Sequence, residues 1–176
     1  MLTIRAEILA DVTIREALLD RAIGRGRNRK TSQRLRDGRL PAEGLAFTAL
    51  SKTGRVVGTL RMWNVIAGSA GPSLLLGPLA VDGRYQGRGI GKELMTHALN
   101  MAKVLGHASV LLVGDEPYYS RFGFSGSFVT DLHLPGPVER DRFLGLELKP
   151  GALDCAEGLV MASGALAFSA GKGLAA

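Results

Sequence analysis

The stretch LLLGPLAVDGRYQGRGIGKEL, residues 74–94, decides the fold. Its first eight residues are almost continuously apolar, as expected of a strand buried on both faces of a sheet. Pro78 interrupts this run, and because proline donates no hydrogen bond to a neighbouring strand, we expect a bulge or splay there. A glycine-rich loop follows, and then comes the most regular helical pattern of the chain. Its apolar stripe consists of Ile90, Leu94, Ala98, Met101, Ala102 and Leu105.

The remaining apolar patterns are shorter. Alternation and apolar runs predict strands at residues 2–8, 45–51, 55–66, 108–113, 124–134, 143–148 and 158–168. Helices are expected after Asp11, with an apolar stripe at Ile14, Leu18, Leu19 and Ala22, and at residues 31–36 and 116–121. Strands outnumber helices, and residues 74–113 read strand, helix, strand. The pattern predicts an α/β (α+β) fold, a mixed sheet flanked by helices.

The bulk composition fits one soluble domain. The chain has 176 residues, of which 46% are hydrophobic and 22% charged, as in ordinary globular proteins. We expect one domain over residues 1–170 and a frayed tail over residues 171–176. The N-terminal residues lack the apolar core of a signal peptide, and no apolar run approaches the ~18 residues of a membrane span. With Cys155 as the only cysteine, these features predict a cytoplasmic protein with no disulfide and no membrane association.

A basic stretch spans residues 21–39. It holds eight Lys and Arg residues against one acid, Asp37, and supplies much of the net charge of +6. Three interpretations stay open: a solvated helix and loop, an attraction for an anionic cofactor or acceptor, and a nucleic-acid surface. Nucleic acid is the least favoured, because the stretch has no aromatic residue on which a base could stack.

The glycine-rich loop is a candidate phosphate site. Backbone N–H groups at a helix N-terminus lack intrahelical acceptors, and the helix dipole adds positive potential there. Arg88 and Lys92 add cationic charge. The spacing excludes two known phosphate loops, since G-x-G-x-x-G needs glycine where Lys92 stands and a P-loop needs glycine where Gln86 stands.

The spacing that does fit is Q-x-x-G-x-G, on Gln86, Gly89 and Gly91. In this motif and the residues around it, the chain resembles the GNAT superfamily of N-acetyltransferases, and within it the YhbS-like branch. The resemblance implies a mostly antiparallel central sheet with a splayed fourth strand. It also implies acetyl-CoA as co-substrate, with its pyrophosphate on the loop. The residues expected to bind acetyl-CoA are Leu79, Ala80, Val81, Gln86, Gly87, Arg88, Gly89, Ile90, Gly91 and Lys92.

A second element of the resemblance is YYSRFGF, residues 118–124, which is similar to the family signature Y-x-x-x-G-F. By position the signature tyrosine is Tyr119. In many members this tyrosine donates a proton to the departing thiolate of CoA. A phenol of pKa ~10 is protonated at neutral pH and suits that role. The alternative is that Tyr119, like Tyr118, is only an aromatic of the core or pocket wall.

The reaction implied by the resemblance is direct attack of a neutral amine on the thioester, with both substrates bound together. Many members place a glutamate on the fourth or fifth strand as the base, but residues 74–81 and 108–113 contain no acid. Asp82, Asp115, Glu116 and His133 lie near the ends of those segments or beyond, and none is assigned as the base. The acceptor, a small molecule or a protein amine, stays unidentified.

Other functions are weighed against this one. A non-catalytic acyl-CoA-binding sensor on the same fold would keep the glycine loop and dispense with Tyr119. A nucleic-acid-binding domain would rely on residues 21–39 and show strongly salt-dependent binding. The three histidines show no metal-ligand spacing, so no metal is expected. Trp63 is expected to pack on the sheet, and pairing of the C-terminal strands would make a homodimer possible.

Overall fold

The structure is a computed structural model that describes residues 2–168, and the predicted tail at residues 171–176 lies outside this range. Eight strands are formed: β1 (Thr3–Ala6), β2 (Ala46–Leu50), β3 (Val56–Ala67), β4 (Pro72–Val81), β5 (Ser109–Val113), β6 (Asp131–His133), β7 (Phe143–Glu147) and β8 (Glu157–Ala162). The α-helices are α1 (Val12–Ala22), α2 (Ile90–Val104) and α3 (Glu116–Tyr119). Short 3-10 helices include Arg25–Arg29, Thr31–Leu35 and Gly126–Val129. The predicted succession of strand, glycine loop and helix is confirmed.

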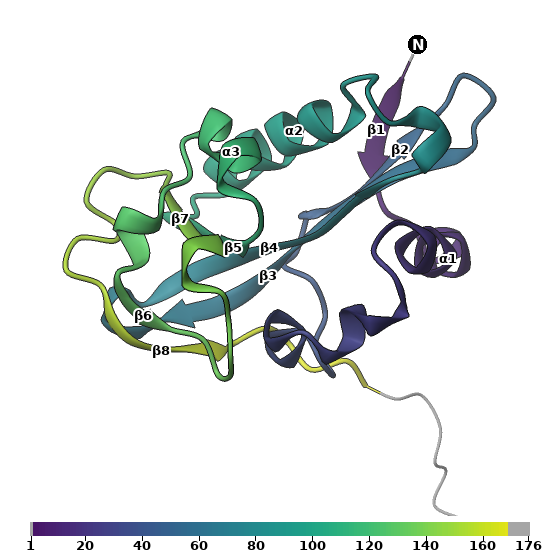
Figure 1. Ribbon diagram of the computed structural model, residues 1–176. Helices are drawn as coiled ribbons and strands as arrows, with labels where there is room; N and C mark the ends of the chain where they lie inside the picture. Colours follow the sequence, from purple (N-terminus) through teal and green to yellow (C-terminus); the bar gives the residue numbers. More distant parts are fainter. Residues whose placement is uncertain (1, 169–176) are drawn as a thin grey trace, which may run out of the picture.

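The strands form one mixed sheet in the order β1-β2-β3-β4-β5-β7. Pairing along this path is antiparallel except between β4 and β5, and β8 joins the sheet beside the far half of β3. Helices α2 and α3 cover one face, while α1 and the 3-10 helices after it lie on the other (Figure 1). The expected mostly antiparallel sheet flanked by helices is therefore confirmed.

Strand β4 separates from β5 halfway along its length. The two strands pair only at Leu74 and Leu75, although β4 continues alongside β3 to Val81. The β3–β4 register shifts beyond Leu76, so that Gly77 and Pro78 bulge out of the ladder. The indole N–H of Trp63 donates to the carbonyl oxygen of Gly77 over 2.7 Å, which fixes the bulge. The splay expected at the proline is present, and it opens a gap in the middle of the sheet.

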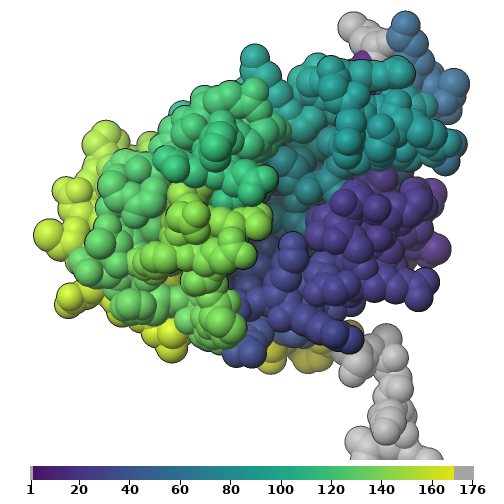
Figure 2. All heavy atoms as spheres, in the orientation of Figure 1, coloured from purple at the N-terminus to yellow at the C-terminus, as the bar shows by residue number. Residues whose placement is uncertain are grey.

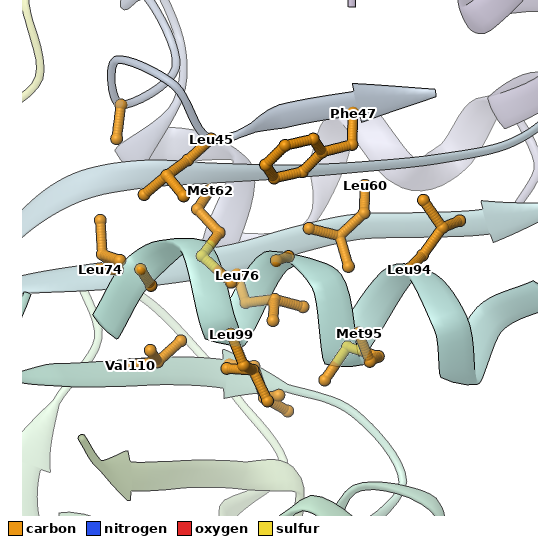
Figure 3. Packing of buried hydrophobic residues seen from close by; sticks show 14 of the residues in the cluster. Leu45, Phe47, Leu60, Met62, Leu74, Leu76, Leu94, Met95, Leu99 and Val110 are labelled. Atoms are coloured by element: carbon orange, nitrogen blue, oxygen red, sulfur yellow. The ribbon is translucent and has the colours of Figure 1, made fainter. Parts of the chain in front are cut away.

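Two hydrophobic cores lie on the two faces of the sheet. Alternate residues of β4 point to opposite sides, so Leu74 and Leu76 join the core under α2 while Leu75 joins the other. In the first core, Leu94, Met95 and Leu99 of α2 meet the sheet (Figure 3). β4 is thus buried on both faces, as its continuous apolar run predicts.

Two of the C-terminal strand predictions are wrong over most of their length. Residues 124–134 form only β6, preceded by the 3-10 helix Gly126–Val129, because the hydroxyl of Ser125 accepts a hydrogen bond from the Ser127 N–H and starts a turn. The guanidinium of Arg140 donates hydrogen bonds to the carbonyls of Val129 and Leu132. Beyond β8, residues 163–168 leave the sheet and run against the basic stretch, where Leu40 N–H donates to the Ala165 carbonyl over 2.8 Å.

The buried face of α1 also differs from the prediction. Leu18 and Leu19 are buried, but Ile14 is 48% exposed and Arg15 takes a buried position in its place. Arg15 is neutralised there by ion pairs with Glu7 and Glu16. An apolar stripe alone could not predict a buried arginine, because its partner Glu7 comes from the segment before the helix.

We predict that Gly58→Val in β3 destabilises the fold. A Cβ atom on Gly58 would lie 3.0 Å from Leu94 and 3.1 Å from Ile90, so a valine would push α2 off the sheet. The expected loss is about 1–3 kcal/mol of unfolding free energy, measured by urea denaturation with the fluorescence of the single tryptophan. Gly26→Val is the matched control, because a Cβ atom at Gly26 meets nothing within 4 Å. Equal midpoints for the two variants would contradict this packing.

Candidate active site

The loop after β4 is anchored by Asp82. Its carboxylate accepts a hydrogen bond from the backbone N–H of Arg84 over 3.0 Å and pairs with the Arg84 guanidinium at 2.8 Å. Hydrogen bonds from this guanidinium and N–H hold the pKa of Asp82 far below its usual range. The side chain is buried and stays ionised, so Asp82 serves to shape the loop and is not suited to accept a proton.

The backbone of the loop presents free N–H groups at the start of α2. Gly89 precedes the helix in the left-handed conformation, with φ of 79°, and Gly87 has φ of 75°. Among residues 2–168, the N–H groups of residues 87–92 have no backbone acceptor. A Cβ atom at Gly87 or Gly89 would meet nothing within 4 Å, so the loop is open to a ligand. Convergent free N–H groups at a helix N-terminus suit a phosphate.

A groove of about 430 Å³ runs from β4 over this loop, and we call it the glycine-loop groove. It is lined by Leu79, Ala80, Val81, Tyr85, Gln86, Gly87, Gly89, Ile90, Gly91, Lys92, Tyr118 and Arg121. The structure therefore brings together every residue predicted for the cofactor except Arg88. The side chain of Arg88 packs over the Tyr85 ring at 5.2 Å and lines a neighbouring cavity with the hairpin at residues 51–53, which borders the groove at Tyr85 and Ile90.

Tyr118 and Tyr119, which follow β5 on α3, point to different places. A Cβ atom on Gly91 would lie 2.9 Å from the Tyr118 hydroxyl, so Tyr118 belongs to the glycine-loop groove. The Tyr119 ring packs against Gly114, where a Cβ atom would lie 2.3 Å from the ring. Burial, with the neighbouring Tyr118 and Asp115, raises the pKa of Tyr119 to about 12. Tyr119 is therefore a neutral phenol that can donate a proton.

A second cavity, of about 460 Å³, opens at the splay between β4 and β5. Its walls are residues 76–79 of β4, residues 112–115 at the end of β5, Tyr119, and residues of the basic stretch. Four cationic side chains line it, Arg27, Lys30, Arg36 and Arg142, and we call it the cationic cleft. Figure 2 views the side of the molecule that is hollowed between the N-terminal segment, in purple, and the green segment after β5.

Leu79 lines both the glycine-loop groove and the cationic cleft. The two cavities therefore meet where β4 leaves β5. Tyr119 belongs to the cleft and Tyr118 to the groove, so the pair stands at this junction with ring centroids 4.9 Å apart. A ligand held on the loop and a second molecule in the cleft would both border Leu79.

The other candidate residues are dispersed. Of the titratable residues near the strand ends, Asp115 lines the cleft and pairs with Arg142 at 3.3 Å, while Glu116 and His133 are exposed. Cys155 is an exposed free thiol, and Trp63 packs in the sheet as predicted. Within residues 2–168, no three His, Cys, Asp or Glu side chains gather as a metal site would require. No helix in that range is long and apolar enough to span a membrane.

Sequence reasoning missed several residues of these cavities. Arg121 lines the groove although it was not singled out, while Tyr118 lines it as the pocket-wall aromatic that the sequence analysis allowed. Arg142 reaches the cleft from the 3-10 helix Arg140–Arg142 just before β7, and no local pattern marks it. Arg36 and Lys30 lie inside the basic stretch, but their spacing does not distinguish them from the other six cations there. Only the fold selects which of these charges face the cleft.

Comparisons with known proteins agree with this geometry. Residues 43–126 match the family model described as an acetyltransferase (GNAT) domain. The chain is 33% identical over 159 residues to a protein of Escherichia coli K12 named uncharacterized N-acetyltransferase YhbS, covering 89% of this chain and 93% of that one.

Two solved structures share the fold. The crystal structure of Escherichia coli YhbS in complex with CoA matches with a TM-score of 0.77 and 32% identity, over 92% of this chain and 89% of that one. A GNAT family acetyltransferase from Brucella melitensis in complex with acetyl-CoA matches with a TM-score of 0.66 and 26% identity, over 93% and 96% of the two chains. The resemblance drawn from residues 74–94 and 118–124 is confirmed, and the chain belongs to the GNAT family of N-acetyltransferases.

Proposed function

We propose that this protein transfers the acetyl group of acetyl-CoA to an amine that enters through the cationic cleft. One observation carries the proposal: the glycine-loop groove and the cationic cleft meet at Leu79, beside Tyr119. Two substrates held in the two cavities would have their reacting groups at this junction, and holding them there lowers the entropic barrier. The CoA and acetyl-CoA bound in the two related structures support the cofactor assignment.

The residues of the loop fit the pyrophosphate of acetyl-CoA. The free N–H groups of residues 87–92 would donate to the phosphate oxygens at the positive end of α2. Lys92 and Arg121 line the groove and add positive charge. Arg88 contributes its backbone N–H rather than its guanidinium, which lies over Tyr85.

The splayed half of β4 fits the pantetheine arm. Beyond Leu75 the edge of β4 that faces β5 has no partner strand, so its backbone groups are free to pair with the amides of the arm. Hydrogen bonding alternates along the strand, so Leu79 and Val81 direct their backbone groups to this edge while those of Ala80 face β3, and all three residues line the groove. The thioester would then lie near Leu79, where the cleft opens.

The thioester supplies an acetyl group bonded to a good leaving group. The acceptor nitrogen, after losing a proton from its ammonium form, forms the N–C bond at the carbonyl carbon as the C–S bond breaks. The Tyr119 hydroxyl gives its proton to the departing sulfur and regains one from the acetylated nitrogen. The products are an amide and free CoA, and the tyrosine returns to its neutral form.

The competing function on this fold is a non-catalytic acyl-CoA sensor. A sensor needs the glycine-loop groove but has no need of a neutral phenol at the junction with a second cavity. The position of Tyr119 in the cleft favours the enzyme. We propose in addition that residues 1–170 work as one acetyltransferase domain.

We predict that Gly89→Asp abolishes most of the stabilisation by acetyl-CoA. At about 100 times its dissociation constant, the ligand adds ~2.7 kcal/mol to the stability of the wild type. The aspartate places a negative charge on the phosphate site and strains a residue with φ of 79°. We expect at least a tenfold loss of affinity, measured by calorimetry and thermal unfolding.

Gly106→Asp is the matched control for this variant. Gly106 has φ of 84°, a Cβ atom there meets nothing within 4 Å, and it lies at the opposite end of α2. This variant should lose similar intrinsic stability but keep the acetyl-CoA shift. An undiminished shift in Gly89→Asp would remove the loop from the cofactor site.

We predict that Tyr119→Phe lowers kcat about 100-fold and leaves the acetyl-CoA affinity unchanged. The phenylalanine keeps the ring that packs on Gly114 and Phe124, so only the proton is lost. Because the pKa of Tyr119 is about 12, the phenol is protonated at every pH up to about 10. The ratio of the wild-type kcat to the Tyr119→Phe kcat should therefore stay constant from pH 7 to 10. CoA release from acetyl-CoA with a panel of small amines, followed with a thiol-reactive dye, gives both rates.

Tyr118→Phe is the control for this experiment, since Tyr118 carries the same hydroxyl but faces the groove. We expect its kcat to stay within a factor of a few of the wild type. Equal losses in the two variants would refute the assignment of the proton donor to Tyr119. Acetyl-CoA binding without turnover for any amine of the panel would favour the sensor.

A further inference from the structure

The charges around the cationic cleft are unbalanced. Its lining carries Arg27, Lys30, Arg36 and Arg142, against the single carboxylate of Asp115. Two of the four cations are neutralised within the fold. Arg27 pairs with Glu16 and Asp20, and Arg142 pairs with Asp115.

Lys30 and Arg36 are left without a carboxylate. Within residues 2–168, neither side chain forms an ion pair. The neighbouring acid Asp37 accepts instead from the side-chain amide of Gln33, over 2.7 Å. The cleft therefore presents two cationic side chains that form no ion pair among residues 2–168.

Of these two side chains, Arg36 shows more clearly what kind of ligand the cleft would bind. Its Nε is buried and has no hydrogen-bond partner among the described residues. A Cβ atom on Gly77 would lie 2.9 Å from its Nη2, so the guanidinium lies directly on the bulge of β4. Burial, with repulsion from Arg27 and Arg61, lowers the pKa of Arg36 to about 10, so it is still charged at neutral pH.

A desolvated cation without a counter-charge is unfavourable, and proteins normally pair it. Arg36 would be satisfied by an oxyanion, which its planar guanidinium can bind through two parallel hydrogen bonds. That anion would lie against Gly77, two residues from Leu79, where the cleft meets the glycine-loop groove.

We infer that the acceptor is a small amine that also carries a carboxylate or phosphate group, which Arg36 binds with help from Lys30. This inference rests on the acetyl transfer proposed above and names the class of its acceptor. The anion anchors the molecule at Gly77, and its amine then points toward Leu79 and Tyr119. A cleft of about 460 Å³ is of the size that holds small molecules.

The phosphates of the cofactor are an unsuitable partner for Arg36. The loop that suits them opens into the glycine-loop groove, and that groove has its own cations, Lys92 and Arg121. Arg36 lines only the cleft on the other side of the junction. Replacing the Arg36 side chain should therefore leave the affinity for acetyl-CoA unchanged.

The test compares acceptors that differ only in the anion. Glycine and β-alanine are paired with their carboxamides, and phosphoethanolamine is paired with ethanolamine, so that the pairs also distinguish carboxylate from phosphate. In the wild type we expect the anionic member of at least one pair to have a kcat/KM at least tenfold higher. In Arg36→Gln this value should fall about 100-fold, mainly through KM, while that of the neutral member changes less than about threefold. Arg36→Lys keeps the charge and should recover part of the loss.

Stability gives a readout that is independent of turnover. Because Arg36 has no partner in the ligand-free protein, Arg36→Gln should leave Tm unchanged or raise it. Arg27→Gln is the matched control, since it removes a cation of the same cleft that has two carboxylate partners, and it should lower Tm by about 3–6 °C. If Arg36→Gln lowered Tm as much as Arg27→Gln does, Arg36 would be a structural residue and the inference would be overturned.

The anion site can also be probed with inorganic phosphate in the Gly89→Asp background, where the loop is blocked. Phosphate should raise the Tm of Gly89→Asp but not of Gly89→Asp with Arg36→Gln. Equal use of anionic and neutral acceptors by the wild type, or weaker acetyl-CoA binding by Arg36→Gln, would also contradict the inference. A wild type that fails to bind acetyl-CoA would instead contradict the proposed function, so the two failures are distinguishable.

Discussion

The separation of β4 from β5 after Leu75 is the constraint on which the rest of this structure depends. Parallel strands normally satisfy each other's backbone groups along their whole length. Here the ladder stops after two residue pairs, while β4 stays hydrogen-bonded to β3 on its other edge. The bulge at Gly77 and Pro78, held by the Trp63 indole, keeps the free edge in place without unravelling the strand. The sheet thereby gains an opening through its middle that two ligands can approach from different sides.

The two approaches to this opening use different kinds of positive charge. On the glycine-loop side the charge is mostly backbone, the N–H groups and dipole of α2, which suit a phosphate regardless of what else the ligand carries. On the cleft side the charge is carried by side chains from distant segments, the basic stretch and the 3-10 helix before β7. Backbone charge is fixed once the loop is formed, whereas side-chain charge varies with the sequence. The cofactor side can therefore be shared across a family, and the cleft side can differ from member to member.

The same distinction explains what could be predicted from the sequence. The glycine loop and α2 are contiguous, so the resemblance drawn from their motif pointed to most residues of the groove, while Tyr85, Arg121 and the direction of the Arg88 side chain were missed. The splay was predictable because Pro78 lies within the strand itself. The cleft was not predictable, because Arg36 and Arg142 are more than a hundred residues apart in the chain and meet only in the fold. Residues 124–134 were misassigned for a related reason: Arg140, which binds their carbonyls, is outside the segment.

The basic stretch shows why a count of charges does not predict a function. Arg27 and Arg36 have the same side chain and lie nine residues apart, yet Arg27 is neutralised by Glu16 and Asp20, whereas Arg36 forms no ion pair with the described residues and its Nε has no hydrogen-bond partner among them. Arg34 and Arg39 are used for structure, since they donate to the carbonyls of Pro135 and Gly164. A surface built for nucleic acid would leave most of its cations free to reach phosphates. Here Arg27, Arg34 and Arg39 are used by the fold, and Arg36 lies on the bulge of β4, where a single small anion can neutralise it.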